Sequence, residues 1–375
     1  GDHLLRQVAG LLSESVRRDD LVARFGGDEF AVLLQRCPLE KAQAIATAIC
    51  EKVDAYRYVA DDGRRFRVGA SVGMVPVDAR WASVSSLLQG VDEACYAAKH
   101  AGRGRVVVRD TGAPQDGAEH PSAWGARIEA ALDNDGFELH AQRLVPIDGQ
   151  PAGLHCEVLL RMVGADGAPI APAAFMPSAE RYQLASRIDR WVLRRVLGML
   201  ATRRLDGVEQ VAVNLSGQSV GDSEFHRYAR RAIVESGVRP GLLAFEITET
   251  AAITNLAQAT AFIEDLRTLG VQVALDDFGS GTSSFAYLKQ LQVDVLKIDG
   301  QFVKGLLDCP LDESAVRCFA DVARVLGIAT VAEHVEDADT CRRLGELGIG
   351  QAQGYHFHRP QPFAEVLDGH AAAQG

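Results

Sequence analysis

Acidic and amide side chains recur in the second part of the chain, each near the end of a short apolar segment. Most are glutamate or aspartate, and a lysine and an arginine lie among them. Oxygen ligands of this kind favour Mg²⁺, Mn²⁺ or Ca²⁺ over soft metals. The set comprises Glu157, Arg161, Asn214, Glu246, Glu249, Asp276, Asp277, Lys297, Asp299, Glu333, Glu336 and Gln353.

Such a set could hydrolyse a phosphoester if its members converge. Packed carboxylates raise each other's pKa unless cations neutralise them. Two ions roughly 3.5–4 Å apart can bind the attacking and leaving oxygens of an in-line displacement. The adjacent Asp276 and Asp277 could serve both ions, Arg161 suits a phosphate oxygen, and Lys297 could hold and activate the water. For any one acid, capping a helix is the simpler explanation, but caps favour Ser, Thr, Asp and Asn, whereas this set is rich in Glu.

The elements that must position these residues are short apolar strands alternating with helices. Eight strands with intervening helices over about 250 residues favour an α/β fold, a (β/α)₈ barrel, over an open doubly wound sheet. The carboxyl ends of parallel barrel strands open on one face, so the polar set is expected to meet there. We expect strands over residues 137–145, 153–161, 208–216, 242–250, 271–279, 293–299, 328–336 and 349–357, and helices over segments such as 255–270 and 313–327.

Residues 1–110 have a different, α+β pattern. Helices are expected over residues 2–14, 39–56 and 85–102, and strands over 66–77 and 105–109. Within residues 21–35 two apolar runs flank Gly26 and Gly27, which predicts a hairpin whose tip needs a positive φ. Residues 111–124 are rich in Gly, Pro and polar residues and are interpreted as a linker between domains of residues 1–110 and 125–375.

Charge and composition narrow the partners and the compartment. The 375 residues carry 39 basic and 50 acidic side chains, a net charge of −11, which argues against binding a nucleic acid polymer. No apolar run reaches the roughly 18 residues that would span a bilayer.

Seven scattered cysteines without a CxxC pair indicate reduced thiols in the cytoplasm. Because the chain opens with Gly and no leader follows, we expect a fragment whose parent could carry an upstream sensor or membrane region.

Residues 125–363 resemble the EAL family of cyclic di-GMP phosphodiesterases. The resemblance implies a TIM-like barrel with an antiparallel first strand, and hydrolysis of cyclic di-GMP to linear pGpG with two Mg²⁺ or Mn²⁺ ions. It also implies a homodimer. The motifs that carry it are EVLLR (157–161), VNLS (213–216), FEITET (245–250), LDDFGSG (275–281), LKID (296–299), VAEHVE (331–336) and QGY (353–355).

The same resemblance implies which residues hold the two ions. The ligands of the first ion would be Glu157, Asn214, Glu246 and Asp276. The ligands of the second would be Asp276, Asp277 and Glu333.

Roles in catalysis and substrate binding are likewise implied by position. Lys297 would position the water, with Glu157 in the catalytic set. Glu249 would keep the loop after Asp277 in its working shape. The residues expected to contact the dinucleotide are Arg161, Gln353 and Leu159.

Departures from the family pattern, three of them close to predicted site residues, keep a second hypothesis open. Thr282 and Phe285 also vary the loop that follows LDDFGSG. Val158 replaces the Ala of the EAL motif, Met162 stands where Trp is common, and His334 replaces a Gly. Some members with Val at this position bind the dinucleotide without cutting it. The alternative is therefore a non-catalytic cyclic di-GMP receptor that signals by conformation, although the complete metal set favours the enzyme.

Residues 1–110 resemble the GGDEF family of diguanylate cyclases. The glycines of the motif would let the backbone approach a triphosphate, and its two acids would serve metal binding and catalysis. The motif is intact at Gly26, Gly27, Asp28, Glu29 and Phe30.

Two further features bear on this first domain. Arg17 and Asp20 fit the family's RxxD product-inhibition site, and a solvated charged turn is a comparable alternative. The family pattern starts upstream of residue 1, so we expect a partial domain that is regulatory or inactive here. GTP would then be a ligand of the full protein.

Overall fold

The computed structural model describes residues 2–59, 65–79, 81, 83–100, 104–109, 123–149, 153–164, 166–281 and 285–374. The chain divides into two compact units, Gly1–Arg127 and Ile128–Gly375, and the division falls within helix α4, Ala123–Asp133. Of the expected linker, residues 111–122 lie outside the described residues, so the sequence-based domain boundaries remain predictions. Within the described ranges, no helix is both long enough and apolar enough to cross a membrane.

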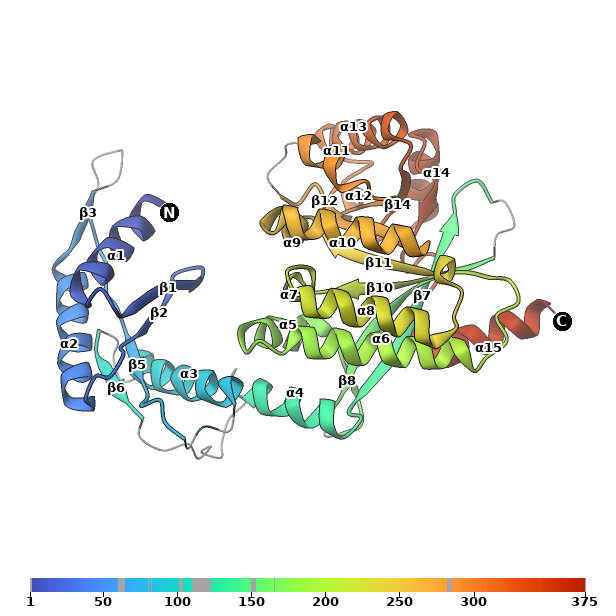
Figure 1. Cartoon of the computed structure of the whole chain (residues 1–375). Helices are drawn as coiled ribbons and strands as arrows, with labels where there is room; N and C mark the ends of the chain where they lie inside the picture. Colours follow the sequence, from blue (N-terminus) through green and yellow to red (C-terminus); the bar gives the residue numbers. More distant parts are fainter. Residues whose placement is uncertain are drawn as a thin grey trace. The chain divides into compact units, whose positions relative to one another are not determined.

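Helices and short strand pairs make up the first unit, in keeping with an α+β pattern (Figure 1). β1 pairs with β2 and β3 with β4 in antiparallel fashion, whereas β5 and β6 are parallel. The elements are α1 (Asp2–Ser15), β1 (Leu21–Gly26), β2 (Glu29–Leu33), α2 (Leu39–Ala55), β3 (Arg57–Val59), β4 (Arg65–Arg67), β5 (Val72–Met74), α3 (Val84–His100) and β6 (Val106–Val108).

The β1–β2 hairpin forms at the predicted place. Gly27 has a φ of 49°, a conformation that residues with a Cβ rarely adopt, and it occupies the tip. Leu12 of α1 and Ile49 and Val53 of α2 form a buried cluster, against which Phe30 of β2 packs. The apolar faces of two helices and the hairpin therefore share one small core.

The single strand expected over residues 66–77 is wrong. The structure has two separate strands there, β4 and β5, with an irregular segment between them. β4 pairs with β3 and β5 with β6, so the chain must change sheets. Val68 and Ala70 of the intervening segment pack on the helix core, which explains why the apolar run continues where the strand does not.

Within the described residues of the second unit, eight strands close into a barrel in the order β7-β15-β14-β13-β12-β11-β10-β8, and β8 returns to pair with β7. β7 runs antiparallel to both β8 and β15, and the other neighbours are parallel. The expected TIM-like barrel with an antiparallel first strand is confirmed. The strands are β7 (Phe137–Pro146), β8 (Leu154–Val163), β10 (Val208–Leu215), β11 (Leu243–Thr248), β12 (Gln272–Phe278), β13 (Val295–Ile298), β14 (Ala329–Ala332) and β15 (Gln351–Ala352).

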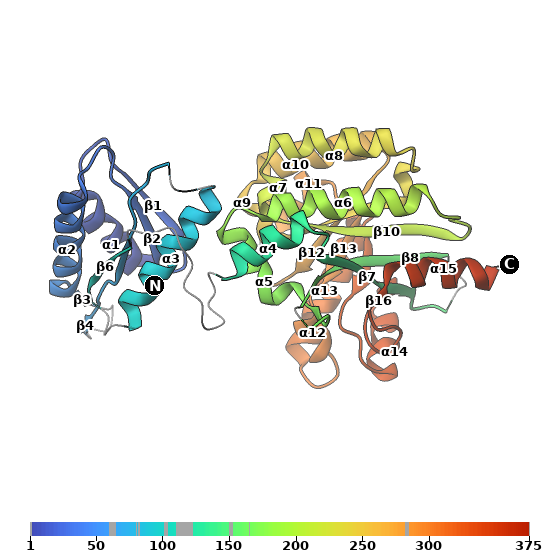
Figure 2. The same ribbon diagram turned by 90° about the horizontal axis from the view of Figure 1, so that it is seen from below.

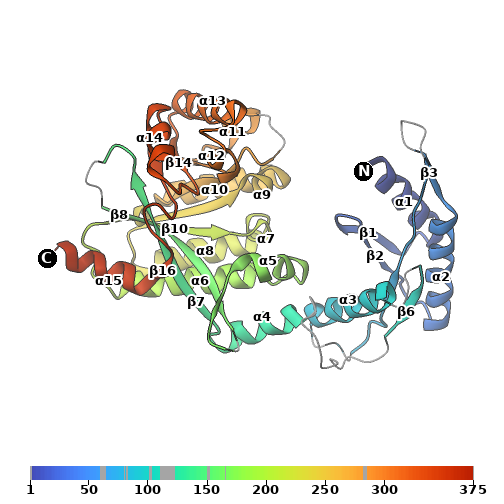
Figure 3. The ribbon, with the colours of Figure 1, turned by 180° about the vertical axis from the view of Figure 1, so that it is seen from behind.

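Helices cover the outside of this barrel. α6 and α8 lie alongside one another outside β10 (Figure 2), and β7 and β8 run next to each other as long ribbons (Figure 3). The remaining elements are β9 (Pro169–Ile170), α5 (Pro172–Arg181), α6 (Ala185–Ala201), α7 (Gly217–Val220), α8 (Ser223–Ser236), the 3₁₀ helix η1 (Pro240–Leu242), α9 (Glu249–Thr254), α10 (Leu256–Leu269), the 3₁₀ helix η2 (Phe285–Tyr287), α11 (Leu288–Leu291), α12 (Gly300–Lys304), α13 (Pro310–Leu326), α14 (Ala338–Glu346), β16 (Gln361–Pro362) and α15 (Phe363–Gln374).

Most of the parallel barrel strands are largely buried on both faces, which is why they are near-continuous apolar runs in the sequence. The first five of the six residues of β11 are buried. Phe225 of α8 and Phe262 of α10 pack edge to face, with ring centroids 6.2 Å apart, and both are fully buried. Phe262 also stacks on Phe245 of β11, with ring centroids 6.4 Å apart, so aromatic packing joins these helices to the sheet that holds the polar residues.

The last expected strand, residues 349–357, is much shorter in the structure. Pairing stops after Ala352, and the backbone of Gly354 then passes directly against Val335. Any Cβ at Gly354 would collide with the Val335 backbone, so only glycine permits this approach. The chain turns away immediately after Gln353 as a result.

Candidate active site

A lysine ammonium lies among four carboxylates that the barrel brings together. Lys297, on β13, has a side chain only 1% exposed. Its Nζ lies 2.6 Å from Glu246 Oε2, 2.8 Å from Glu333 Oε1 and 3.0 Å from Asp276 Oδ1. Glu157 Oε2 is 3.4 Å away. Residues separated by more than 170 positions in the chain therefore form one cluster of charges.

Glu157 is held by amide donors as well as by the lysine. Asn214 donates from Nδ2 to Glu157 Oε1 at 2.6 Å, and Gln353 donates from Nε2 to Glu157 Oε2 at 2.7 Å. Gln142 of β7 accepts a second hydrogen bond from Gln353 Nε2 at 3.2 Å. Asn214 uses its nitrogen in this contact, which leaves its Oδ1 as a possible ligand atom.

Burial and neighbouring charges together set the pKa values of the cluster. Burial opposes the charge on Lys297, but four carboxylates outweigh it and hold the lysine pKa well above its ordinary value. Burial also opposes ionisation of Glu157, yet Lys297 and the amide donors bring that pKa below its usual value. Burial and the Glu157 charge raise the pKa of Glu246, and burial raises the pKa of Glu333 to about 8. The single positive charge of Lys297 therefore does not neutralise all four carboxylates, and the pKa values of Glu246 and Glu333 remain raised.

Asp276, Asp277 and Glu333 form a second grouping at the same end of the barrel. Each offers one carboxylate oxygen, and these oxygens all lie within 4.8 Å of one another. Neighbouring strand residues normally face opposite sides, but Asp277 has a φ of 54° and the β12–β13 register shifts between Leu275 and Phe278. This local bulge lets two consecutive aspartates serve one site.

The donor set fits divalent cations that prefer oxygen. Its members are carboxylates and one amide, without thiol or imidazole among the predicted ligands. Asp276 Oδ1 is buried and accepts no hydrogen bond, although the lysine ammonium is close to it, and Gln353 Oε1 is also buried without a donor. Buried acceptors of this kind are normally satisfied, so a ligand or ion is the expected partner.

Glu249 organises the loop that follows β12. This buried glutamate opens α9, and its Oε2 accepts hydrogen bonds from Gly279 N at 2.9 Å and Gly281 N at 3.3 Å. Its Oε1 accepts from the Tyr287 hydroxyl at 2.7 Å. Tyr287 was not among the residues singled out in the sequence. One side chain thus ties the segment after Asp277 to the end of β11.

The predicted substrate-contacting residues lie on β8 and beside β15. Arg161 and Leu159 are half-buried on β8, a few residues beyond Glu157. Arg161 donates from Nη1 to the Leu160 carbonyl at 2.8 Å, and burial lowers its pKa. Gln353 is buried and bonded to Glu157. Substrate contact by these residues stays a prediction.

Besides Glu249, two further acids of the polar set belong neither to the cluster around Lys297 nor to the grouping with Asp277. Asp299 caps α12, because its Oδ1 accepts from Gln301 N at 2.7 Å. Glu336 is exposed after β14. The helix-cap explanation therefore holds for Asp299. The idea that polar residues mark strand ends also needs correcting, since Glu157 and Glu246 lie within β8 and β11.

The three departures from the family pattern lie at the edges of this site. Val158 and Met162 are buried, each 2% exposed, with Val158 paired to Ala141 of β7. His334 is exposed, has a φ of 56°, and its ring lies where a side chain at Gly300 would have to be. The small residue at position 300 therefore accommodates the histidine.

In the first unit the GGDEF segment shapes the hairpin. Arg24 donates from Nε and Nη2 to the Gly27 carbonyl at 3.0 and 2.8 Å, which braces the tip. Asp28 is exposed, and Glu29 Oε1 lies 3.9 Å from Lys99 Nζ. Phe30 packs into the helix core. Their roles toward a nucleotide remain predictions.

Asp20 has a structural task in the turn before β1. Its Oδ2 accepts from Arg17 N at 2.9 Å and its Oδ1 from Gln35 N at 3.0 Å. These backbone hydrogen bonds lower the pKa of Asp20. The pair Arg17 and Asp20 thus joins the start of β1 to the residues after β2, and an inhibitory role for it stays a prediction.

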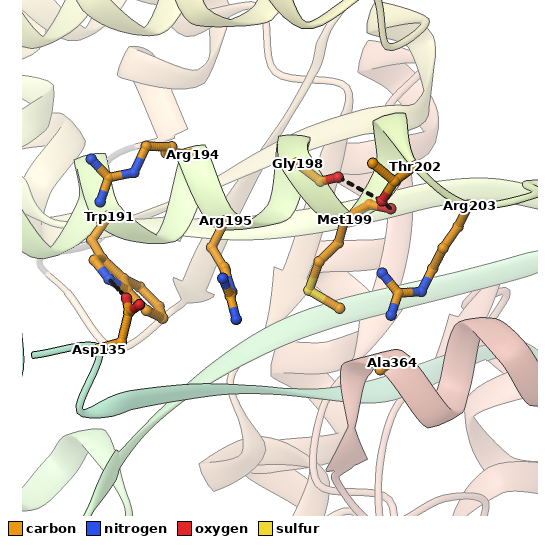
Figure 4. A pocket seen from close by; sticks show the side chains of 9 residues that line it. All are labelled: Asp135, Trp191, Arg194, Arg195, Gly198, Met199, Thr202, Arg203 and Ala364. Carbon is orange, nitrogen blue, oxygen red and sulfur yellow. Dashed lines mark hydrogen bonds between the residues drawn. The ribbon is translucent and has the colours of Figure 1, made fainter.

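A separate pocket of about 620 Å³ is lined by α6, Asp135 and Ala364 of α15, and it shares no lining residue with the acid cluster (Figure 4). Arg195, Met199 and Arg203 leave α6 on the same side, the side on which Ala364 of α15 lies. Trp191 donates from Nε1 to Asp135 Oδ1 at 3.3 Å. The pocket lining has one carboxylate, Asp135, whereas the cluster around Lys297 has four. We therefore place the candidate active site at Lys297 and its acids.

The fold and the site together indicate the class of protein: a closed α/β barrel with four carboxylates around a buried lysine. The chain belongs to the EAL-domain family, because the family model of the EAL domain matches residues 126–360. The model described as diguanylate cyclase, GGDEF domain, matches residues 1–105.

Curated relatives carry names that fit this family. The cyclic di-GMP phosphodiesterase PdeB of Shewanella oneidensis is 35% identical over 371 residues, which cover 98% of this chain and 43% of PdeB. The cyclic di-GMP phosphodiesterase PdeF of Escherichia coli is 36% identical over 243 residues, or 64% of this chain and 32% of PdeF. This chain thus spans less than half the length of these two relatives.

Solved structures of similar domains agree with the barrel. The structure titled "PaMucR Phosphodiesterase, c-di-GMP complex" is 31% identical, with a TM-score of 0.61, and covers 65% of this chain and 99% of that chain. The FimX EAL domain from Pseudomonas aeruginosa bound to c-di-GMP is 28% identical, with a TM-score of 0.59, covering 64% of this chain and 96% of that one.

Proposed function

We propose that the second unit hydrolyses cyclic di-GMP to linear pGpG in a reaction that needs Mg²⁺ or Mn²⁺. The observation that carries this proposal is the gathering of Glu157, Glu246, Asp276 and Glu333 around the Lys297 ammonium. The names of the curated relatives and the c-di-GMP complexes of similar domains support the choice of substrate.

The residues that would hold two ions divide between the two groupings of acids. Two divalent ions, when bound, would neutralise the carboxylates and polarise the scissile phosphodiester. The first would be held by Glu157, Asn214, Glu246 and Asp276, and the second by Asp276, Asp277 and Glu333.

The remaining side chains would bind the water and the dinucleotide. The Lys297 ammonium would hold the attacking water by a hydrogen bond and stabilise the negative charge that it acquires. The oxygen of that water would form a bond to phosphorus and release its proton to solvent. One P–O3′ bond would break, and the leaving O3′ would take up a proton from solvent and become a hydroxyl. Arg161 would bind a phosphate oxygen, Leu159 would contact the ligand, and Gln353 would orient Glu157 while offering its free Oε1.

The direct test is to incubate the purified chain with cyclic di-GMP and Mn²⁺ and to quantify pGpG by chromatography. We expect pGpG from the wild type, none in EDTA, and none from Glu246→Gln. Glu209→Gln is the matched control, because Glu209 lies at the start of β10 and pairs with His155 instead of Lys297. Intact dinucleotide that stays bound and uncut would favour the receptor hypothesis that Val158 keeps open.

Three finer points belong to the same proposal. We propose that the protein acts as a homodimer, that the full protein binds GTP at its GGDEF domain, and that it works in the cytoplasm, where its seven free thiols would stay reduced. Light scattering would establish the oligomeric state. Titration of the full protein with GTP would test the second point.

A further inference from the structure

A buried carboxylate outside the acid cluster gathers three hydrogen bonds on one oxygen. Asp189, on the inner side of α6, is 4% exposed. Its Oδ2 accepts from Ser216 N at 2.9 Å, from Ser216 Oγ at 2.6 Å and from Ser219 Oγ at 2.6 Å. Burying an acid is costly unless it is well bonded, so this arrangement calls for an explanation beyond core packing.

The donors to Asp189 lie directly beyond the end of β10. Ser216 follows the last residue of that strand and caps α7, where its hydroxyl accepts from Ser219 N at 3.3 Å. Asn214, the predicted metal ligand on β10, is two residues before Ser216. Asp189 therefore fixes the backbone just after Asn214 to a helix on the outside of the barrel.

Asn214 needs such support because the strand ladder holds it from one side only. β10 pairs with β11 as far as Leu215, and Asn214 lies opposite Glu246. On the other side, the pairing of β10 with β8 ends at Val213, which lies opposite Val158. Glu157 and Glu246, in contrast, lie within strands that are paired on both sides at those positions.

We propose that Asp189 is a positioning residue that holds Asn214 in place through Ser216 and Ser219. The inference rests on the proposed function insofar as Asn214 is a ligand for the first ion. Groups that orient a metal ligand from outside typically change metal affinity by about 10- to 100-fold when they are removed. Asp189 is thus expected to govern metal affinity without touching the metal or the substrate.

The test is a calorimetric titration of the whole chain with Mn²⁺. Asp189→Leu keeps the number and branching of the side-chain heavy atoms but removes every acceptor, and we expect its Mn²⁺ affinity to fall by at least about tenfold. Asp189→Asn retains an oxygen that can accept the same bonds, so its affinity should stay within about threefold of the wild type. Asp222→Ala is the control, because Asp222 caps the neighbouring α8 instead.

A background lacking Asn214 separates positioning from general damage. The Asn214→Ala variant keeps the other proposed ligands of the first ion. In this variant, adding Asp189→Leu should change the Mn²⁺ affinity by less than about threefold, because the ligand that Asp189 positions is already absent. An equal tenfold loss in both backgrounds would overturn the inference. So would an unchanged affinity in Asp189→Leu that circular dichroism shows to be folded.

Two further measurements keep the outcome decisive. If Asp189→Leu does not fold, Ser219→Ala removes one donor alone, and a twofold or greater loss of Mn²⁺ affinity supports the proposal while none overturns it. A wild type that binds Mn²⁺ but yields no pGpG would refute the proposed hydrolase and leave the Asp189 inference to be judged on affinity. A wild type that binds no Mn²⁺ would overturn both.

Discussion

Lys297 Nζ and Glu246 Oε2 lie 2.6 Å apart inside the barrel, and neither side chain is more than 2% exposed. Charges buried this deeply depend on their partners, because removing one leaves the other unpaired at a cost of about 3–5 kcal/mol. The same contact that prepares the site for chemistry therefore contributes to the stability of the second unit.

Lys297→Met is expected to lower the free energy of unfolding of the second unit by about 3–5 kcal/mol in EDTA. Added Mn²⁺ should restore more stability to this variant than it adds to the wild type, because the ions supply the positive charge that the ammonium supplied. Calorimetric melting with and without Mn²⁺ measures both effects. Lys289→Met, at an exposed position on α11, is the control. An equal loss in both conditions would contradict the expectation.

Glu157→Gln should abolish pGpG formation while leaving the barrel folded. The substitution removes a ligand charge, and its amide nitrogen would face a donor, either Asn214 Nδ2 or Gln353 Nε2. We expect kcat to fall more than about 100-fold. Steady-state kinetics and circular dichroism check the two parts of this prediction. Turnover near the wild-type value would show that Glu157 is not part of the site.

Glu249→Ala should loosen the loop after Asp277. Three donors would lose their acceptor, and the cost is largest for the buried Tyr287 hydroxyl, because a buried donor left unsatisfied costs about 1–3 kcal/mol. We expect kcat to drop by about tenfold or more. Tyr287→Phe removes a single hydrogen bond, so it should cost about 1 kcal/mol and keep turnover within about threefold. Urea unfolding and kinetics of both variants test the comparison, and equal effects from the two would count against a loop-holding role.

Asp189 should make stability depend on pH between about 4 and 6. Burial raises its pKa from 3.8 to about 6 in the folded protein, so the folded state binds this proton more tightly than the unfolded chain does. Its contribution is then fully present below about pH 4 and is lost as pH rises through about 6, with a total of about 3 kcal/mol. The difference in unfolding free energy between the wild type and Asp189→Asn should follow this course in urea titrations. A difference that stays constant across this range would show that Asp189 titrates normally.

The barrel strands can be predicted from the sequence because most of them are near-continuous apolar runs. That signal comes from burial between the barrel interior and the helices, so it survives without any knowledge of strand order. It fails where an apolar run serves two sheets, as at residues 66–77, and where close backbone packing at Gly354 ends a strand early. The hydrophobic pattern of a sequence indicates which residues are buried, but it does not indicate which element covers them.

The site was harder to derive in full. Carboxylates in apolar strands pointed to Glu157, Glu246 and Asp276, but capping produces the same pattern, as Asp299 shows. The contributions of Tyr287 and Asp189 depend on tertiary contacts that span 38 and 27 residues. A lone Asp in the apolar pattern of α6 was the one available signal for the latter.

The seam of the barrel has a consequence for how the protein is made. β15 and β16 both pair with β7, and Gln353 lies between them. A nascent chain that has not yet emerged beyond residue 350 would expose the β7 edge, a surface prone to pairing with other chains. The bond from Gln353 to Glu157 would also be missing. Closure of the barrel at β7 and completion of the hydrogen bonds around Glu157 therefore both depend on residues 351–362.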